Sequence, residues 1–192
     1  MTISGFHRID TTSIPGLYLA CVELSAREGD GLYINGIANT VRDDRDSLDA
    51  LMFTGCDGED VMSVPNVHTI IKEIKPKHMR TVLSTSGRFP DPLDDILGAG
   101  YADTVLIHLD SLPDHAQTRT MEIVRNNGCT LYVTVTVGPG RIRPEDAKEL
   151  SEKISGAQAI FLRHSGDKRY KTSELTSMAG MLKHCAKEVR MC

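Results

Sequence analysis

The sequence predicts an α/β fold built on a parallel sheet with right-handed crossovers. Short β-rich apolar runs recur along the 192 residues, and most of them are followed by a segment with a helical pattern. Several runs, such as TVLIHL and AIFL, are almost continuously apolar, which is typical of parallel strands covered on both faces. An open doubly wound sheet and a partial barrel both satisfy this alternation. The six predicted strands are Leu17–Leu24, Leu51–Thr54, Met79–Ser84, Thr104–Leu109, Thr130–Val137 and Ala159–Arg163.

The helices between these strands have recognisable boundaries. Pro65 and Asn66 precede an apolar stripe in VHTIIKEIK, and Asp91-Pro92 opens a helix that glycines end. Asp114 leads into a helix that runs through Val124, and Pro144 opens DAKELSEKI. The last predicted helix, at about 172–189, is amphipathic and is expected to cover an open sheet edge. Its apolar positions are Leu175, Met178, Met181, Leu182 and Cys185.

Residues 26–49 interrupt the alternation. The segment carries GDG and NG turn signals and little periodicity, so we expect an irregular excursion with one short strand, Leu32–Ile34. The GDG at 29–31 lacks the spacing and the Lys-Ser/Thr pair of a phosphate-binding loop. We find no domain boundary, and we therefore expect a single domain over residues 1–192.

Composition excludes several classes of protein. The formal net charge is -4, so no nucleic-acid footprint is indicated. No apolar run reaches the roughly 20 residues that span a bilayer, and MTISGFHRID does not read as a signal peptide. Five cysteines at irregular spacing argue against a disulfide framework. We expect reduced thiols and a cytoplasmic protein without nucleic-acid or membrane partners.

The order of motifs resembles the activating-enzyme branch of the radical SAM family, especially anaerobic ribonucleotide reductase activating proteins. ISGFHRIDTTSIPG resembles the N-terminal segment of that branch, and LMFTGCDGED resembles its strand and Thr-Gly-Gly-Glu loop. NVHTIIKEIKPKHMRTVLSTSG resembles the helix and strand that follow. YADTVLIHLD and LYVTVTVGPGRIRPEDAKELSEKISGAQAIFLRH resemble the remaining strands, turn and helix. This resemblance implies a six-stranded (βα) partial barrel, an incomplete TIM-like barrel, and a link to anaerobic metabolism.

The cluster motif of that family is absent. The family binds a four-iron cluster through CxxxCxxC after the first strand, whereas this stretch reads LACVELSAREGDGLYINGIAN with Cys21 alone. Cys56 follows the second strand and Cys129 precedes the fifth. Cys185 and Cys192 are seven residues apart, so we expect them on roughly one helix face. A 4Fe-4S cluster is therefore not expected.

The resemblance also implies positions for S-adenosylmethionine (SAM). The loop that contacts the SAM amino group in the family is Gly55-Cys56-Asp57 here, and the third strand ends in a run containing Ser84 and Ser86. Thr134 stands where activating proteins often have an arginine. SAM or another nucleotide-like small molecule could still bind this rim through backbone donors.

Acid–base or metal chemistry has a second candidate group. His108 and Asp110 are two apart on one strand, so they share a face at its carboxyl end, while His164 ends the sixth strand and Asp57 follows the second. Two histidines and two carboxylates could bind a metal or transfer protons. The alternative, a strand-end histidine held by the backbone beside solvated aspartates, is favoured.

The turn Gly138–Arg143 could hold an anion through glycine amides, Arg141 and Arg143 near a helix N-terminus. A tight turn with exposed charges is the simpler interpretation. Three functions stay open. The leading one is a radical-SAM-like protein without radical chemistry, not itself an enzyme, that binds or regulates a protein partner. The alternatives are an enzyme using the rim His/Asp group and a SAM or nucleotide sensor.

Overall fold

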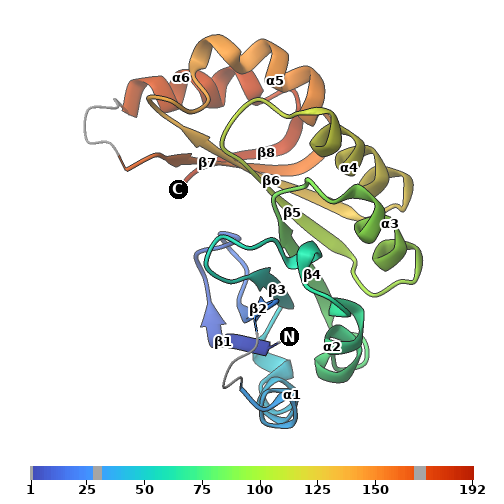
Figure 1. Cartoon of the computed structure of the whole chain (residues 1–192). Coiled ribbons are helices and arrows are strands. Elements are labelled where there is room, and N and C mark those ends of the chain that lie inside the picture. The colour runs from blue at the N-terminus through green and yellow to red at the C-terminus, as the bar shows by residue number, and fades with distance from the viewer. Residues whose placement is uncertain (1, 28–31, 167–171) are drawn as a thin grey trace. The chain divides into compact units, whose positions relative to one another are not determined.

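The structure is a computed structural model that describes residues 2–27, 32–166 and 172–192. Eight strands form one sheet whose hydrogen-bonded order follows the chain from β1 to β8 (Figure 1). Strands β2, β3 and β4 pair in parallel, as do β6, β7 and β8. The predicted α/β class is therefore confirmed, but the predicted count of six strands is wrong. The chain divides into two compact units, residues 1–85 with 91–105 and residues 86–90 with 106–192.

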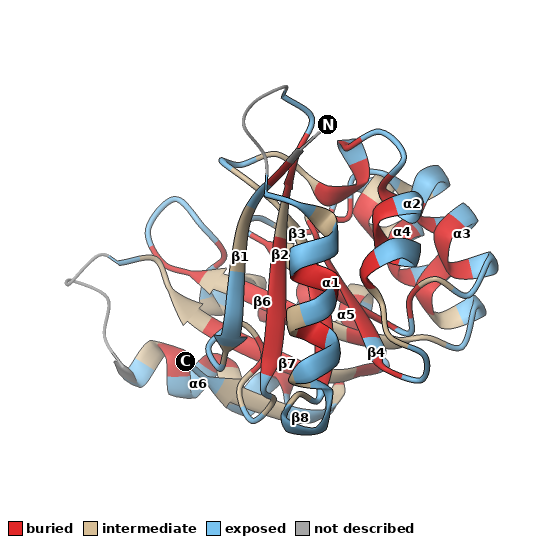
Figure 2. Ribbon diagram, turned by 90° about the horizontal axis from the view of Figure 1, so that it is seen from below, coloured by how far each residue is buried: buried red, intermediate tan, exposed pale blue. Residues whose placement is uncertain are grey.

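The first unit holds strands β1 (Thr2–Asp10), β2 (Leu19–Ser25), β3 (Ala50–Gly55) and β4 (Arg80–Thr85). β1 is one of the two strands that are not among the six predicted from apolar runs, and it pairs antiparallel with β2. Its side chains are mostly exposed or half-buried, in contrast to the buried β2 and β4 (Figure 2). An edge strand of this kind has no apolar run in its sequence, which explains why it was not predicted.

The helices of the first unit include one that replaces a predicted irregular segment. Within residues 26–49, α1 (Ile34–Asp43) and a short 3-10 helix, η1 (Arg45–Ser47), are formed. The predicted strand Leu32–Ile34 is therefore wrong, because Ile34, Ile37, Ala38 and Val41 follow helical spacing and three of them are buried. The Gly29-Asp30-Gly31 sequence lies outside the described residues. The unit also contains η2 (Val61–Ser63), α2 (Val67–Ile74) and most of α3 (Pro90–Gly98).

The second unit carries most of β5 (Thr104–Leu109), then β6 (Thr130–Val137), β7 (Ala157–His164) and β8 (Ala186–Met191). Both β5 and β6 have the predicted bounds. Its helices are α4 (His115–Asn126), η3 (Pro144–Asp146), α5 (Ala147–Ile154) and α6 (Thr172–Leu182). Within this unit, α4, α5 and α6 lie on one side of the strands (Figure 1).

The predicted C-terminal helix at 172–189 is too long. α6 ends at Leu182, and the chain then forms β8 in parallel register with β7. Leu175, Met178 and Leu182 are buried, whereas Met181 is 45% exposed. Cys185 precedes β8 and Cys192 follows it, so the two thiols do not share a helix face. In the described part of the chain, no helix is both long and apolar enough to cross a bilayer.

Candidate functional site

The loop that follows β3 is tightly folded. A Cβ at residue 55 would lie 2.0 Å from the carbonyl oxygen of Glu59, so glycine is required there by the close approach of the backbone. Asp57 and Gly58 then adopt left-handed φ values of 51° and 81°. The amide of Cys56 donates to Leu24 O at 2.9 Å, and the amide of Glu59 donates to Cys56 O. The backbone amides of Cys56 and Glu59 therefore already donate to carbonyl groups of the same unit.

Glu59 ties this loop to the end of β2, a role that the sequence analysis missed. Its carboxylate accepts hydrogen bonds from the amide of Ala26 at 2.9 Å and from Ser25 Oγ at 3.1 Å. Arg27 Nε lies 3.5 Å from the same carboxylate. The bond from the Ala26 amide, with those from Ser25 and the charge of Arg27, lowers the pKa of Glu59. The chain after β2, where the resemblance places the cluster loop, is thus held by Glu59.

Asp60 is a second residue that the sequence analysis missed. Its side chain caps η2 by accepting from the amide of Met62 at 2.8 Å. Both of its carboxylate oxygens also accept from Thr85 Oγ at the end of β4, at 2.9 and 2.8 Å. Ser84, one position earlier, is only 6% exposed and pairs with Thr54 of β3. An aspartate before a short apolar run is the signal that could have identified this cap.

The cysteines of the first unit do not fit a four-iron cluster of the family type. This unit contains two cysteines, Cys21 and Cys56, whereas that cluster takes three thiolates from one loop. Cys21 lies inside β2, in register with His7 and Met52, and is 4% exposed. Burial, together with the negative charges of Asp10 and Glu23, raises the pKa of Cys21 to about 12. Cys21 is therefore buried within a strand, whereas the family takes its cluster ligands from the loop that follows the first strand.

In the second unit, His108 and Asp110 lie at the carboxyl end of β5, as predicted. A Cβ at Gly87 would lie 3.2 Å from Ile107 and 3.5 Å from Gln117, which belongs to α4. Ile107 therefore faces α4, and His108 faces the side of the strand without helices because side chains alternate along a strand. Asp110 lies beyond the strand end, where one carboxylate oxygen is 3.0 Å from Arg141.

His164 lies on the opposite face from His108. It shares a strand face with Leu162, which is in register with Met191 of β8. Met191 Sδ accepts a hydrogen bond from Thr176 Oγ of α6 at 3.8 Å, so this face is the one covered by helices. The amide of Gly166 donates to His164 Nδ1 at 3.1 Å. The structure therefore does not bring the two histidines together, and a local backbone contact holds His164.

Aspartate 57 belongs to the first unit, while the two histidines and Asp110 belong to the second. No grouping of three or more His, Cys, Asp or Glu side chains suited to a metal ion occurs among the described residues. Within the second unit, the group described in the sequence analysis is divided, because its two histidines lie on opposite faces of the strands. Of its members, His108 and Asp110 remain associated with one strand end.

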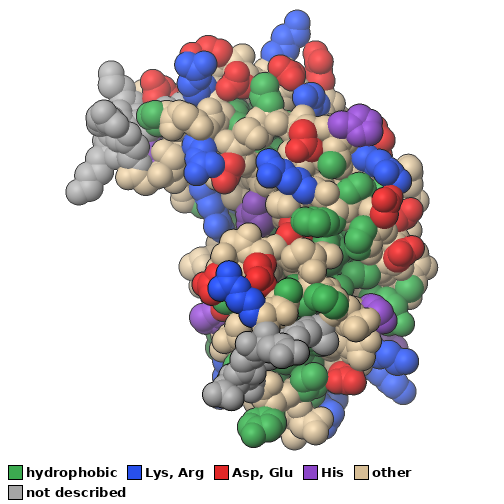
Figure 3. All heavy atoms as spheres, in the orientation of Figure 1, with side chains coloured by type: hydrophobic (Ala, Val, Ile, Leu, Met, Phe, Trp, Pro, Cys, Tyr) green, Lys and Arg blue, Asp and Glu red, His purple; other side chains and the backbone are tan. Residues whose placement is uncertain are grey.

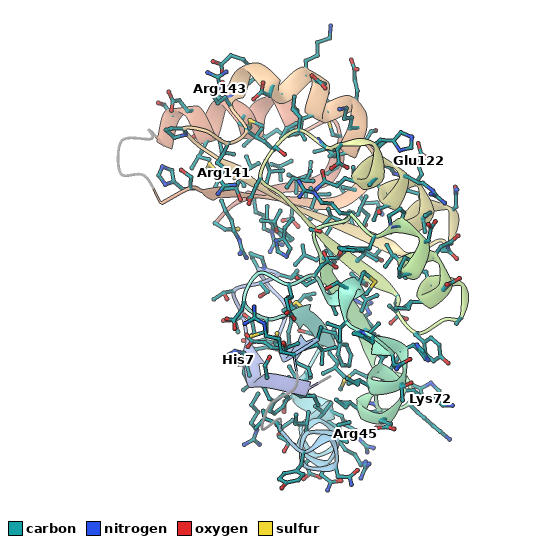
Figure 4. The ribbon with its side chains drawn as sticks, in the orientation of Figure 1. His7, Arg45, Lys72, Glu122, Arg141 and Arg143 are labelled. Carbon is teal, nitrogen blue, oxygen red and sulfur yellow. The ribbon has the colours of Figure 1, made fainter. Side chains whose placement is uncertain are left out.

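The turn from Gly138 to Arg143 is closed by its own backbone. Gly138 N donates to Ile142 O at 3.1 Å, and Arg141 N donates to Gly138 O at 3.0 Å. The side chain of Arg141 pairs with Asp110, whereas that of Arg143 lies 3.9 Å from Glu145. The two arginines are labelled in Figure 4. The two guanidinium groups therefore pair with different carboxylates. An anion binding here would compete with both pairs.

Gln117 and Thr120 of α4 are further residues that the sequence analysis missed. Gln117 Nε2 donates to Ser86 O at 2.8 Å, and Thr120 Oγ donates to Gly87 O at 2.7 Å. Both side chains are almost fully buried. The sequence signal for them was a pair of polar residues, three apart, on the face of a helix expected to be buried. Through these two hydrogen bonds, Gln117 and Thr120 hold the segment that contains Ser86 in place.

Comparison with known proteins shows a structural likeness without a sequence match. No family model matches the chain, and no curated protein matches it. Streptococcus suis SuiB bound to S-adenosylmethionine superimposes with a TM-score of 0.61 at 11% identity, over 86% of this chain and 44% of SuiB. SuiB bound to its precursor peptide SuiA gives 0.61 at 10% identity, over 85% and 43%.

A third similar structure is TsrM from Kitasatospora setae, a radical S-adenosylmethionine methyltransferase with cobalamin and a [4Fe-4S] cluster bound. It superimposes with a TM-score of 0.51 at 14% identity, over 69% of this chain and 31% of TsrM. The chain thus spans less than half the length of either protein. At these identities the likeness concerns the fold alone, and the fold is radical SAM-like.

Proposed function

We propose that this chain is a binding or regulatory protein that uses a radical SAM-like fold without initiating radical chemistry. The observation that carries the proposal is the state of the cysteines where a cluster would be held. The sequence contains no CxxxCxxC, and its one cysteine near that position, Cys21, is buried within β2 with its pKa raised to about 12. Because iron–sulfur clusters are held by thiolates, this arrangement supports a fold that acts without one.

The hydrogen bonds that hold the loop after β3 in place support the same proposal. Glu59 accepts hydrogen bonds from Ser25 and Ala26, so the loop after β3 positions the chain that leaves β2. Asp60 in turn accepts from Thr85 at the end of β4. Three strand ends of the first unit are thereby joined by side chains that need no bound group to hold them. A scaffold of this kind can present a binding surface without a cluster.

The partner that we propose is a peptide or protein. SuiB, whose fold is similar, has been solved with its precursor peptide bound. Charged side chains of both signs are dispersed over the face seen in Figure 3, and no single-sign field dominates it. Recognition of a peptide through mixed polar contacts is compatible with such a surface.

Anaerobic reconstitution tests the absence of a cluster. The purified chain is incubated with ferrous iron, sulfide and reductant, desalted, and analysed for iron, sulfide and visible absorption, then assayed for reductive cleavage of SAM. We expect a colourless protein with iron near background and no 5′-deoxyadenosine. A radical SAM enzyme taken through the same steps serves as the positive control.

A brown protein with stoichiometric iron and sulfide would overturn the proposal. The variants Cys21→Ser and Cys56→Ser then separate a specific cluster from adventitious iron, because a specific cluster is lost when a ligand is removed. A partner is sought separately by pull-down from the native host, with the Glu59→Ala variant, which frees the loop after β2, as the comparison.

Sensing of SAM is a second candidate, and the SAM-bound SuiB structure favours it because the two folds are similar. A sensor gains stability with ligand by an amount set by the ligand concentration relative to the dissociation constant. SAM, S-adenosylhomocysteine and adenosine at millimolar concentration are compared by thermal unfolding. A rise in melting temperature with SAM that adenosine does not produce would support this candidate, and no rise with any of the three ligands would eliminate it. The third candidate, a rim His/Asp enzyme, receives no support from histidines on opposite faces.

A further inference from the structure

A pocket of about 490 Å³ lies in the first unit, at the amino ends of two adjacent strands. One wall is formed by residues that precede β3, namely Arg45, Asp46, Leu48 and Asp49, and the other is formed by residues 76–80 at the start of β4. Ala50 and Arg80 are partners in the parallel register of these strands, so the two loops are side by side. The pocket is within the size range of small-molecule sites. It is at the opposite strand ends from the loop that contains Gly55 and Glu59.

Three cationic side chains, Arg45, Lys77 and Arg80, line the pocket together with two carboxylates, Asp46 and Asp49. Lys77, His78 and Arg80 come from the second loop and are exposed, and Arg45 comes from the first. Within the part of the chain that the structure describes, Lys77, His78 and Arg80 form no ion pair. These charges are notable in a chain whose formal net charge is -4. Their concentration in one pocket favours an anionic ligand.

The acidic side chains of the pocket are already engaged. Asp49 accepts a hydrogen bond from the amide of Tyr18 at 2.8 Å, which fixes one of its oxygens. Asp46 pairs only with its neighbour Arg45, at 3.5 Å, and both side chains are mostly exposed. An exposed pair of this kind contributes little, and the Asp46 side chain is 91% exposed, so its carboxylate can turn to solvent when a ligand contacts Arg45.

Apolar atoms complete the pocket. Leu48 and Pro76 are half-buried and Met79 is 9% exposed, so together they offer an apolar surface between the charged groups. His78 is held in the left-handed region with φ 68°, within a turn that the bond from Met79 N to Pro76 O closes. The arrangement combines charged groups for an anion with a surface for an organic group.

We propose that this pocket binds a small phosphorylated molecule. Arg45, Lys77 and Arg80 contact its phosphate oxygens, because guanidinium and ammonium groups form charge-assisted hydrogen bonds with phosphate. The organic part lies against Leu48, Pro76 and Met79. The site is separate from the function proposed above, and it holds whether or not the chain binds SAM or a protein partner.

Titration calorimetry with pyrophosphate, ADP and adenosine tests this site. Pyrophosphate and ADP are expected to bind saturably, and adenosine, which lacks phosphate, is not. Tighter binding of ADP than of pyrophosphate identifies an organic phosphate as the ligand type, and the reverse order identifies an inorganic one. No saturable heat with either phosphate at millimolar concentration overturns the proposal.

Matched variants separate the pocket from general electrostatic attraction. Lys77→Ala with Arg80→Ala is expected to weaken phosphate binding by about tenfold or more, because charge-assisted hydrogen bonds are lost. Lys72→Ala with Lys148→Ala removes the same charge from exposed helix positions outside the pocket, and binding should stay within about twofold. Arg45 and the control position Lys72 are labelled in Figure 4. Equal losses in the two double variants would mean nonspecific attraction and would contradict the site.

All four substituted side chains are exposed, so the variants are expected to fold. Far-ultraviolet circular dichroism and the melting temperature of each unliganded variant verify this. A third variant, Arg45→Ala, extends the test to the other wall of the pocket and should also weaken binding.

Discussion

Glu59 Oε2 lies 2.9 Å from the amide nitrogen of Ala26, so one carboxylate joins the loop after β3 to the residue that follows β2. In a parallel sheet, successive strand ends meet at one edge, but nothing in the backbone pairing fixes the loops beyond them. The Glu59 contact supplies that constraint here. It adds a charge-dependent link to the backbone bond from Cys56 N to Leu24 O at the same edge.

The first prediction concerns pH. The pKa of Glu59 is lowered in the folded protein, chiefly by the hydrogen bond from the Ala26 amide. Its contribution to the free energy of unfolding is therefore present above the unfolded-state pKa of about 4.3 and is lost as the pH falls through the lower folded-state value. Glu59→Gln should reduce the difference in stability between pH 7 and about pH 3, measured by urea unfolding. An unchanged pH profile would mean that the contact is not formed in solution.

A second prediction concerns Asp60, which caps η2 and accepts from Thr85. Asp60→Ala removes both functions and should lower the free energy of unfolding by about 2 kcal/mol. Thr85→Val removes the hydroxyl donor but leaves the cap, so it should cost less. The two substitutions share one interaction, and a double-mutant cycle should therefore show a smaller combined loss than the sum. Additive losses would show that the two side chains act independently.

Much of the second unit could be predicted from the sequence because its strands are buried. The run TVLIHL coincides with β5, since a continuous apolar run bounded by turns has few other interpretations, and the β-branched, alternating TLYVTVTV coincides with β6. β1 and β8 were missed because each carries polar side chains along its length, and only pairing with a neighbour defines them. For α1, the helical spacing was present, but the Asn35-Gly36 turn signal was given more weight.

The candidate site was less predictable than the fold. The sequence located His108 and His164 at strand ends, but a shared rim does not fix which face each side chain takes. That depends on register, and Val137 with His164 and Leu162 with Met191 place His164 on the helix-covered face. Glu59 was missed for a similar reason, because its partners Ser25 and Ala26 lie more than 30 residues away in the sequence.

A third prediction separates the two functions of Gln117. Its side-chain oxygen accepts from the amide of Asp114 in a capping box, while its nitrogen donates to Ser86 O. Gln117→Ala should cost about 2 kcal/mol of stability because the site is buried and two bonds are lost. Gln117→Glu keeps the acceptor and loses the donor, so it should disturb the Ser86 segment while helix α4 retains its cap. Amide hydrogen exchange distinguishes the two variants, since in Gln117→Glu only the segment around Ser86 and Gly87 should lose protection. Loss of protection throughout α4 in both variants would contradict the separation.

The last prediction uses three glycines with different surroundings. Gly55→Ala would place a Cβ 2.0 Å from the backbone oxygen of Glu59, so the loop has to shift, and a loss of about 3 kcal/mol or more is expected. Gly58 has no neighbour within 4 Å but a φ of 81°, so Gly58→Ala should cost only the strain of about 1 kcal/mol. Gly36 lies in α1 with open space around it, and Gly36→Ala should stabilise by about 0.5 to 1 kcal/mol through helix propensity. Denaturant unfolding of the three variants measures the expected order of stability, with Gly55→Ala lowest and Gly36→Ala highest. Of the three substitutions, only Gly55→Ala should also displace Glu59, because only residue 55 lies against its backbone. If Gly55→Ala is as stable as Gly58→Ala, the loop is not packed against itself in solution, and the Glu59 contact would lose its structural basis.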